Sequence, residues 1–339
     1  MEELNNRIFP HTQEWVDLIK EKAEKNESSS QYELGVCYFR GADVEQNYEL
    51  AVKWFARAAE NGYAKAQAFL GLCYMFGTGV EKNVEKALSF YEMSAQNGCS
   101  EAMYSLGFTY INGVSVEKDI EKALDYFRRA AEMGSSAAMY YLGNLYSDGV
   151  YVGKDIGKAL KLYRMAAGED DANAKYALGA LYYYGIDVPQ DYKVAFDWFQ
   201  KAYISADIYS IGVTRAKKAL GDCYLYGLGV EKNVKNALYF YRQAAKKYDS
   251  DAQYILGLLY TDGQYVEKDI EKGLEYLQLA AKNENVYAQY ALGKMYLEGI
   301  DVEKDAQKAM NFFRMAAENG SAEANEYLKE ANISAETIV

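Results

Sequence analysis

Residues 102–113 of the chain read AMYSLGFTYING, and the order of Leu, Gly, Tyr and Gly within them returns at a fixed spacing. We call the Gly that directly follows the Leu the repeat glycine. Consecutive repeat glycines lie 36 residues apart, with a single interval of 42 residues. The eight repeat glycines are Gly35, Gly71, Gly107, Gly143, Gly179, Gly221, Gly257 and Gly293. A period of this size predicts a solenoid, in which each unit buries its apolar face against its neighbours.

The spacing within one repeat predicts two helices. The first carries Ala, Leu, Gly and Tyr on one helical stripe, as in Ala66, Leu70, Gly71 and Tyr74. A glycine in the middle of a helix is unfavourable by about 1 kcal/mol relative to alanine. We therefore expect the second helix to cross closely at the repeat glycine. A second glycine six residues later, such as Gly77, is expected to end the helix in the left-handed conformation.

A regular linker and a second helix complete each repeat. Val follows the second glycine by three residues, and Asn or Asp follows the Val by three, as in Val116 and Asp119. We expect the Val to plug the space under the linker and the Asn or Asp to cap the second helix. That helix alternates bulky and small residues, for example Tyr126 and Phe127 with Ala130. Burial of each large side chain contributes about 1.5–3 kcal/mol.

The predicted fold class is an all-α solenoid of eight helix-turn-helix repeats of about 36 residues, with a half-repeat cap at each end. We assign residues 1–29 to an N-terminal arm and capping helix, with the helix itself at 12–26, and residues 322–339 to a C-terminal capping helix and tail. Because both ends are capped, we expect a complete array. The repeats in 30–321 are expected at about 30–65, 66–101, 102–137, 138–173, 174–215, 216–251, 252–287 and 288–321.

The interval of 42 residues adds six residues within 203–214, between the fifth and sixth repeats. One interpretation is an extra turn and a half on the second helix of the fifth repeat, together with a longer loop. The alternative is an apolar protrusion that offers Ile204, Ile208, Tyr209 and Ile211 to a partner, because an exposed apolar cluster needs such a purpose.

Composition excludes several classes of protein. The formal net charge is −12 and there is no basic stripe, which argues against nucleic acid and anionic membranes as partners. No apolar run approaches the roughly 20 residues of a membrane span. The first residues are polar and acidic, unlike a cleavable signal peptide. We therefore expect a cytoplasmic monomer without membrane insertion, with export into a host cytosol as the alternative location.

The residues that usually carry catalysis are scarce. His11 is the only histidine, and the sequence contains no phosphate-binding glycine loop, nucleophile elbow, HExxH helix or CxxC pair. Cys37, Cys73 and Cys223 share one position of the first helix, so we expect buried packing residues in a reducing compartment. We predict no catalytic residues, no cofactor and no metal site.

The repeat resembles the Sel-one-like repeat (SLR), a relative of the tetratricopeptide repeat. The match extends over roughly residues 30–328. In one repeat the residues that match the motif are Ala102, Tyr104, Leu106, Gly107, Lys122, Ala123, Phe127, Ala130, Ala131 and Gly134. The departures are Gly273 in place of a second-helix Ala, Tyr203 in place of an Ala beside the insertion, and Asp170 and Asp249 near the closing Gly. The Tyr203 departure puts regular stacking of the fifth repeat in doubt.

The resemblance implies a right-handed α/α superhelix and an adaptor that assembles protein complexes. Related proteins act in membrane-protein degradation, in activation of wall synthesis, and in bacteria as signalling scaffolds or host-directed effectors. Some secreted members staple each repeat with a disulfide. This chain lacks paired cysteines and is not similar to that branch.

In such arrays the first helices line the concave surface. We expect the positions three before the repeat glycine, and one, four and five after it, to point outward. Aromatic side chains there suit a peptide or helix, because they give a large contact area at low entropy cost. The alternative for the tyrosines three before the glycine is packing between repeats. The predicted partner-binding residues are Tyr32, Phe39, Tyr104, Phe108, Tyr140, Tyr176, Tyr183, Asp222, Tyr254 and Tyr290.

Acidic residues are expected to give the C-terminal half of this surface an acidic edge that favours a basic ligand; they are Asp148, Asp222, Asp262 and Glu298. The last four residues, 336–339, resemble a C-terminal PDZ ligand. The leading functional hypothesis is a non-catalytic scaffold that binds a protein segment in the concave groove. The alternative is a bacterial effector that acts in a host cell through the same surface, and an enzyme is the third.

Overall fold

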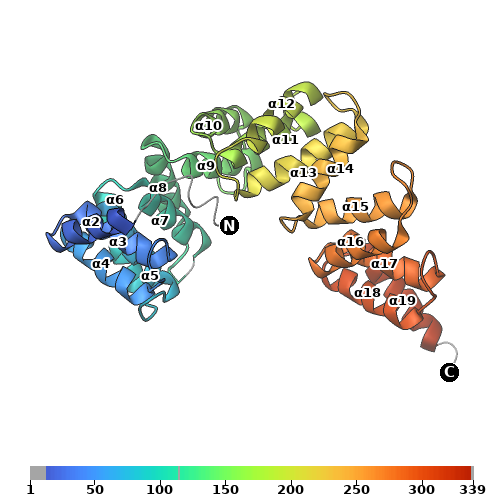
Figure 1. Ribbon diagram of the computed structural model, residues 1–339. Coiled ribbons are helices and arrows are strands. Elements are labelled where there is room, and N and C mark those ends of the chain that lie inside the picture. Colours follow the sequence, from blue (N-terminus) through green and yellow to red (C-terminus); the bar gives the residue numbers. More distant parts are fainter. Residues whose placement is uncertain (1–12, 114, 337–339) are drawn as a thin grey trace. The chain divides into compact units, whose positions relative to one another are not determined.

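The computed structural model describes residues 13–113 and 115–336, with side chains described for residues 14–113 and 115–330. Over these residues the chain forms eighteen α-helices and no strand, which confirms the predicted all-α fold class (Figure 1). The chain divides into two compact units, residues 1–166 and residues 167–339. Each unit is a stack of consecutive helix pairs.

The helix pairs follow the predicted period. The first helices are α3 (Ser28–Arg40), α5 (Ala64–Phe76), α7 (Ser100–Asn112), α9 (Ser136–Asp148), α11 (Ala172–Tyr184), α13 (Ile211–Tyr226), α15 (Ser250–Asp262) and α17 (Val286–Glu298). The second helices are α4 (Tyr48–Glu60), α6 (Val84–Gln96), α8 (Ile120–Glu132), α10 (Ile156–Gly168), α12 (Tyr192–Tyr203), α14 (Val234–Ala245), α16 (Ile270–Lys282) and α18 (Ala306–Glu318). Two further helices are α2 (Gln13–Glu24) and α19 (Ala322–Glu336).

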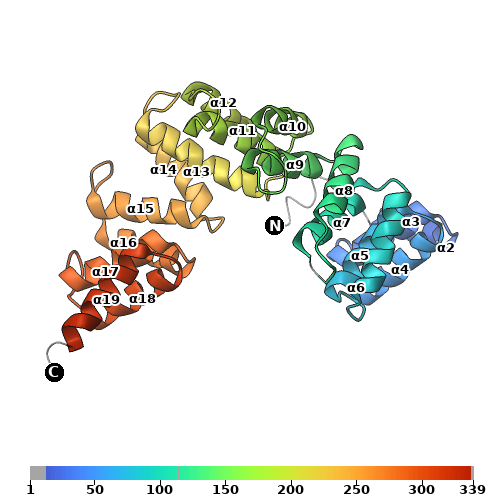
Figure 2. The same cartoon turned by 180° about the vertical axis from the view of Figure 1, so that it is seen from behind.

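Stacking inside each unit is sequential. In the first unit α2 packs on α3, and each second helix packs on the next first helix, as α4 does on α5 and α6 on α7. The second unit repeats this order from α12 on α13 to α16 on α17, and α19 packs on α18. Figures 1 and 2 show α17, α18 and α19 side by side from opposite directions.

The repeat glycines mark the closest approach of the two helices in a repeat, as predicted. A Cβ atom added to Gly71 would lie 2.7 Å from the ring of Tyr91, and one added to Gly179 would lie 2.6 Å from the ring of Phe199. These rings are buried in the core, so the helices would have to separate to admit a methyl group. The close crossing explains why the sequence accepts glycine in the middle of a helix.

The predicted helix ends are also present. Gly77 ends α5 with φ +74°, the left-handed conformation, and its N–H donates to the carbonyl of Cys73. Asn83 begins α6, and its side-chain oxygen accepts the backbone N–H of Lys86 at 2.9 Å. Equivalent glycines and Asn or Asp caps recur along the chain, so sequence-local signals set the length of these helices.

A polar pair joins neighbouring repeats within a unit. The amide of Gln67 donates to the carbonyl of Ala59 in the preceding helix at 3.3 Å, and its oxygen accepts from Asn97 of the following second helix at 2.9 Å. We call this arrangement the Gln–Asn pair. It recurs as Gln31–Asn61, Gln253–Asn283 and Gln289–Asn319. The buried amide of each Gln is thereby satisfied, and the contacts tie three consecutive helices together.

The insertion lengthens a different helix from the one expected. α12 ends at Tyr203 without an extra turn, and the added residues form a loop followed by an additional first turn of α13. The interpretation that assigned the turn to the second helix of the fifth repeat is therefore wrong, although the longer loop is present. The reason is a contact with α11: Gly212 N–H donates to Asn173 Oδ1 at 2.8 Å, and a Cβ on Gly212 would lie 2.5 Å from the backbone of Ala172.

The cysteines are buried and free, as predicted. Burial raises the pKa of Cys73 to about 11 and, with the charge of Asp222, that of Cys223 to about 12. Packing is thus their role in the fold. Among the described helices, none combines the length and apolar character that a bilayer crossing requires.

Candidate protein-interaction surface

The tyrosines three positions before the repeat glycine are half-buried and packed. The ring of Tyr32 lies 5.9 Å from Phe55 of its own repeat and 5.6 Å from Phe69 of the next. Equivalent contacts are made by Tyr104 with Phe127 and Tyr141, by Tyr140 with Tyr163, by Tyr176 with Phe199 and by Tyr290 with Phe313. Tyr254 differs, because it packs against the core cluster of Leu277 and stacks on the exposed Tyr287. These tyrosines therefore serve packing in the helix stack. Binding of a partner to their exposed edges stays a prediction.

The other aromatic candidates differ in exposure. Phe108, one position after its repeat glycine, is 46 % exposed and lies 6.4 Å from Tyr104. Phe39 and Tyr183, four positions after theirs, are half-buried against Tyr48 and Tyr192. Phe108 is thus the predicted residue most open to a partner in the first unit.

Asp222 departs from the expectation. It was predicted to point outward, but it is only 8 % exposed. Its carboxylate accepts a hydrogen bond from the hydroxyl of Tyr241 at 2.8 Å and pairs with Lys218 Nζ at 2.8 Å. The physical reason is that a tyrosine buried against the repeat glycine needs an acceptor for its hydroxyl. Asn144 serves Tyr163 in the same way at 2.8 Å. The outward placement of Asp222 is therefore wrong.

Three exposed aromatic residues were missed. Phe76, Tyr184 and Tyr226 occupy the position five after the repeat glycine and are between 59 % and 70 % exposed. Their position in the sequence could have identified them, because residues five after the repeat glycine are expected to point outward. The other members of that position are polar: Arg40, Asn112, Asp148, Asp262 and Glu298. Of the predicted acidic edge, Asp148, Asp262 and Glu298 are exposed.

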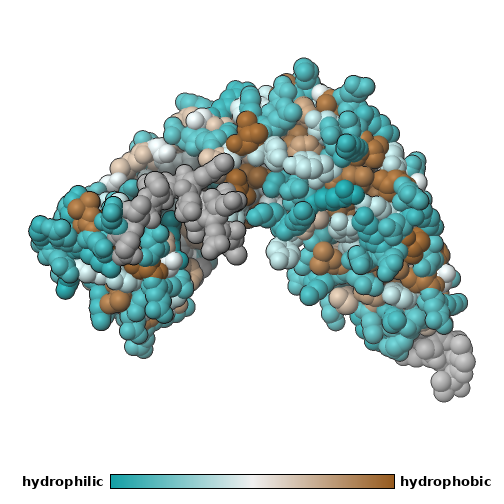
Figure 3. All heavy atoms as spheres, viewed as in Figure 1, coloured by the Kyte–Doolittle hydropathy of each residue, from teal (hydrophilic) through white to brown (hydrophobic). Residues whose placement is uncertain are grey.

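The hydrophobic residues on the face drawn in Figure 3 are dispersed. The face drawn in Figure 3 is mostly hydrophilic, with separate hydrophobic patches rather than one continuous apolar area. In the insertion, Ile204, Tyr209 and Ile211 are exposed and Ile208 is half-buried. The structure therefore supports the alternative interpretation of the insertion, as an exposed apolar protrusion, for three of its four residues.

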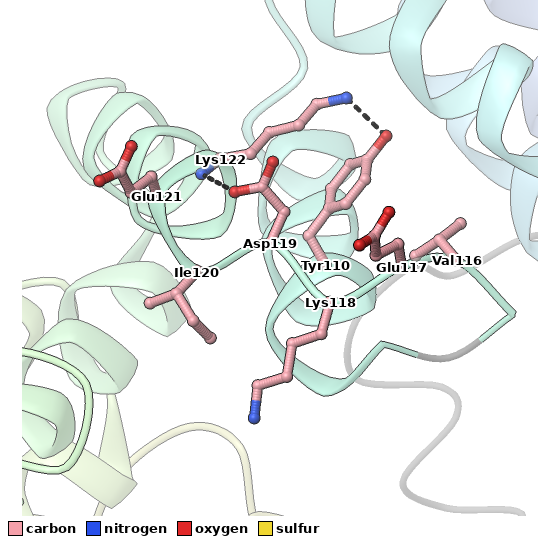
Figure 4. Close-up of a pocket in the computed structure, with 8 residues that line it drawn as sticks. All are labelled: Tyr110, Val116, Glu117, Lys118, Asp119, Ile120, Glu121 and Lys122. Carbon is pink, nitrogen blue, oxygen red and sulfur yellow. Dashed lines mark hydrogen bonds between the residues drawn. The ribbon is translucent and has the colours of Figure 1, made fainter.

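The linker between α7 and α8 lines a shallow pocket (Figure 4). Asp119 accepts the backbone N–H of Lys122 at 2.9 Å, and Lys122 Nζ donates to the hydroxyl of Tyr110 at 2.6 Å. The same ammonium lies 4.0 Å above the ring of Tyr110, which stacks on Tyr126 with 9° between the rings. Comparable Lys–Tyr contacts recur in other repeats, so we assign this pocket to helix capping.

The described residues contain no group of three or more His, Cys, Asp or Glu side chains placed to hold a metal ion. His11 lies outside the described residues, as do residues 337–339 of the tail that resembles a PDZ ligand. Binding of that tail to a PDZ-type partner stays a prediction.

Comparisons with known proteins agree with this geometry. The Sel1 repeat family model matches residues 28–63, 64–99, 100–135, 136–171, 172–206, 214–249, 250–285 and 286–321. The chain is similar to a protective antigen of uropathogenic Escherichia coli that displays an SLR fold, with 31 % identity, a TM-score of 0.68, and coverage of 94 % of this chain and 67 % of the antigen.

It is also similar to a Sel1 repeat protein from Oxalobacter formigenes, with 27 % identity, a TM-score of 0.63, and coverage of 94 % of this chain and 90 % of the other. The comparison with curated proteins found no match. The eight matched segments coincide with the helix pairs and leave out residues 207–213, which belong to the insertion. The chain therefore belongs to the Sel1 repeat family.

Proposed function

We propose that this protein is a non-catalytic scaffold that binds a segment of a partner protein on the faces formed by its first helices. The observation that carries the proposal is the exposure of Phe76 and Phe108 in the first unit, where Phe108 lies 6.4 Å from the half-buried Tyr104. Large aromatic side chains on a rigid helical support provide contact area with little loss of conformational entropy. Sel1 repeat folds are typical of protein-interaction scaffolds, which supports the same assignment.

The second unit offers a related surface of different charge. Tyr184 and Tyr226 are exposed at the ends of α11 and α13, and Asp262 and Glu298 are exposed at the ends of α15 and α17. Carboxylates beside exposed aromatic rings favour a segment that combines basic and apolar side chains. We therefore propose a basic amphipathic segment as the ligand of this face.

We propose that the scaffold works in a reducing compartment such as the cytoplasm, because its four cysteines are free. The second candidate is a bacterial factor that acts inside a host cell. The similarity to a protective antigen of uropathogenic Escherichia coli strains supports this second function. A translocation assay with a reporter fusion separates the two locations, and substrate turnover in a broad screen would contradict a non-catalytic role.

The test begins with peptides selected from a random display library on the full-length protein. We expect the combined Phe76→Ala and Phe108→Ala changes to weaken the peptides that bind the first unit by about tenfold or more in fluorescence polarisation. These residues are better probes than Tyr140 or Tyr176, whose half-buried rings also pack against Tyr163 and Phe199.

The matched control is Met93→Ala with Met133→Ala, two exposed apolar residues on and after second helices of the same unit. Circular dichroism should show unchanged helical content in both double variants. Equal binding by the Phe76 and Phe108 variant and the wild type would overturn the assignment of the first-helix face.

A further inference from the structure

Tyr209 and Ile211 of the insertion help to line a pocket in the second unit. The pocket has a volume of about 290 Å³. We call it the insertion pocket, and it belongs wholly to the second unit. It is lined by Tyr209, Ile211, Thr214 and Arg215 on one side and by Lys247, Tyr248 and Asp249 on the other.

Tyr248 stands in a strained position at the edge of this pocket. Its φ is +64°, the left-handed region, at the place where other repeats carry Gly62, Gly98 and Gly134, and where Asp170 and Glu284 are left-handed as well. A bulky side chain in this region is disfavoured by roughly 1–2 kcal/mol. The left-handed turn is thus a feature of the repeat, and what distinguishes Tyr248 is an aromatic ring that is 77 % exposed.

Positive charge gathers next to the two tyrosines. Lys217 is 8 % exposed and occupies the position of the glutamine in a Gln–Asn pair, and Lys247 occupies that of the asparagine. Burial and, after it, the ammonium of Lys247 lower the pKa of Lys217. Lys247 Nζ lies 4.7 Å from the centre of the Tyr209 ring, which remains 68 % exposed. Arg215 adds a third cation to this part of the second unit.

The carboxylate within the pocket does not balance these cations. Asp249 Oδ1 accepts the backbone N–H of Ala252 at 2.8 Å and so caps α15. Burial raises the pKa of Asp249, which reflects the unfavourable setting of its charge. Two neighbouring lysines form ion pairs with carboxylates other than Asp249: Lys175 pairs with Asp170 and Lys218 pairs with Asp222. An excess of positive charge therefore remains beside exposed aromatic and aliphatic side chains.

We propose that the insertion pocket binds an acidic segment of a partner protein, with an apolar side chain against Tyr209, Ile211 and Tyr248 and carboxylates against Arg215 and Lys247. Charge complementarity carries the choice of ligand, because these cations lie together on a chain whose net charge is −12. This site lies at the N-terminal end of α13 and has the opposite charge preference from the face proposed at the C-terminal ends of the first helices in the second unit.

The binding test uses the full-length protein and a fluorescein-labelled peptide in which Glu residues flank a Phe. Its control peptide has Gln at each Glu position. In fluorescence polarisation at low salt, we expect the Glu peptide to bind about tenfold more tightly than the Gln peptide. Equal affinity for the two peptides would overturn the proposed charge recognition.

Matched variants locate the site. Lys247→Glu and Tyr209→Ala should each weaken the Glu peptide by about tenfold or more. Lys246→Glu makes the same charge change at an exposed neighbour that does not line the pocket, and it should leave affinity within about twofold. Equal losses for Lys246→Glu and Lys247→Glu would show diffuse attraction in place of a pocket.

Two competing occupants are tested in parallel. A second copy of the chain would be the occupant if sedimentation velocity showed a dimer that Ile211→Asp abolishes, and this result would overturn the proposal. Tighter binding of a single-stranded oligonucleotide at the same pocket, lost in Lys247→Glu, would overturn it as well. Unchanged Glu-peptide binding by the Phe76→Ala, Phe108→Ala variant would show that the pocket acts independently of the first-helix face.

Discussion

Adjacent repeats of the second unit carry different residues at the same pair of packing positions, an uncharged hydrogen-bonded pair in one and two cations in the other. In the repeat of α15 and α16, Gln253 donates to the carbonyl of Ala245 at 3.1 Å and accepts from Asn283 at 2.8 Å. In the repeat of α13 and α14, the corresponding residues are Lys217 and Lys247, two cations that repel each other. The helix pair keeps its form in both repeats.

This position is therefore not needed equally for stability in every repeat. The repeat of α11 is intermediate between the uncharged pair and the two lysines. It also buries a cation, Lys175, but this side chain is paired with Asp170 and donates to Ser205 at 2.9 Å. A buried cation without such a partner is unfavourable. The chain nevertheless buries Lys217 at this position, and the exposed Lys247 at the partner position lines the insertion pocket. In one repeat the pair of positions thus joins helices, and in the adjacent repeat Lys247 is open to the proposed ligand.

The largest effect is expected from moving the charged arrangement into the regular repeat. Gln253→Lys with Asn283→Lys would bury a cation that faces another cation and leave the carbonyl of Ala245 without its amide donor. We expect the free energy of unfolding of the second unit to fall by on the order of 3 kcal/mol, measured by urea denaturation followed by circular dichroism.

The control is Gln253→Met with Asn283→Met, a pair that the chain itself uses at Met103 and Met133. An apolar pair buries no charge, so its effect should be about 1 kcal/mol, from the lost hydrogen bonds. If the lysine pair were no more damaging than the methionine pair, charge burial would not distinguish the two repeats.

An intermediate effect is expected at Asp222, on the same helix as Lys217. Asp222→Leu leaves the buried hydroxyl of Tyr241 and the ammonium of Lys218 without their acceptor. We expect a loss of about 2 kcal/mol in urea denaturation. Adding Tyr241→Phe removes the orphaned hydroxyl, so the double variant should be more stable than Asp222→Leu alone. Simple additivity of the two losses would contradict a structural role for this pair.

The smallest effect is expected in how the contribution of Lys217 to the free energy of unfolding changes with pH. Its pKa is lowered in the folded protein, so folding disfavours the charged amine, and Lys217→Gln should raise stability at pH 7 by about 1 kcal/mol. As the pH rises through the lowered pKa toward the ordinary value of 10.5, the folded protein releases this proton first and the penalty falls. The advantage of Lys217→Gln over the wild type should therefore shrink.

Paired urea titrations of the two proteins across this range measure that difference. Other groups that titrate in the same range, such as tyrosines, are common to both proteins and cancel in the comparison. Lys246→Gln is the control, because the exposed neighbour should show no such trend. A constant difference at every pH would show that the charge of Lys217 is not the source of its effect.

Much of the fold could be predicted because its signals are local. The repeat glycines, the second glycines and the Asn or Asp caps each act within a few residues of the chain, and Gly71, Gly77 and Asn83 all behave as expected. The buried cysteines followed from their shared position in the first helix. The candidate surface was less predictable, because a half-buried tyrosine such as Tyr32 has the same sequence signature in packing and in binding.

The period, the helix pairs and the packed faces can be read from the order of the residues, since these features follow from spacing along a helix and from residue size. The polar groups that interact between helices are known only once the helices are packed: Asp222 with Tyr241, Gln253 with Asn283, and Lys217 with Lys247. These partners lie 19 to 30 residues apart in the chain. Their contact depends on how closely two helices approach, and helical periodicity within one helix does not contain that distance.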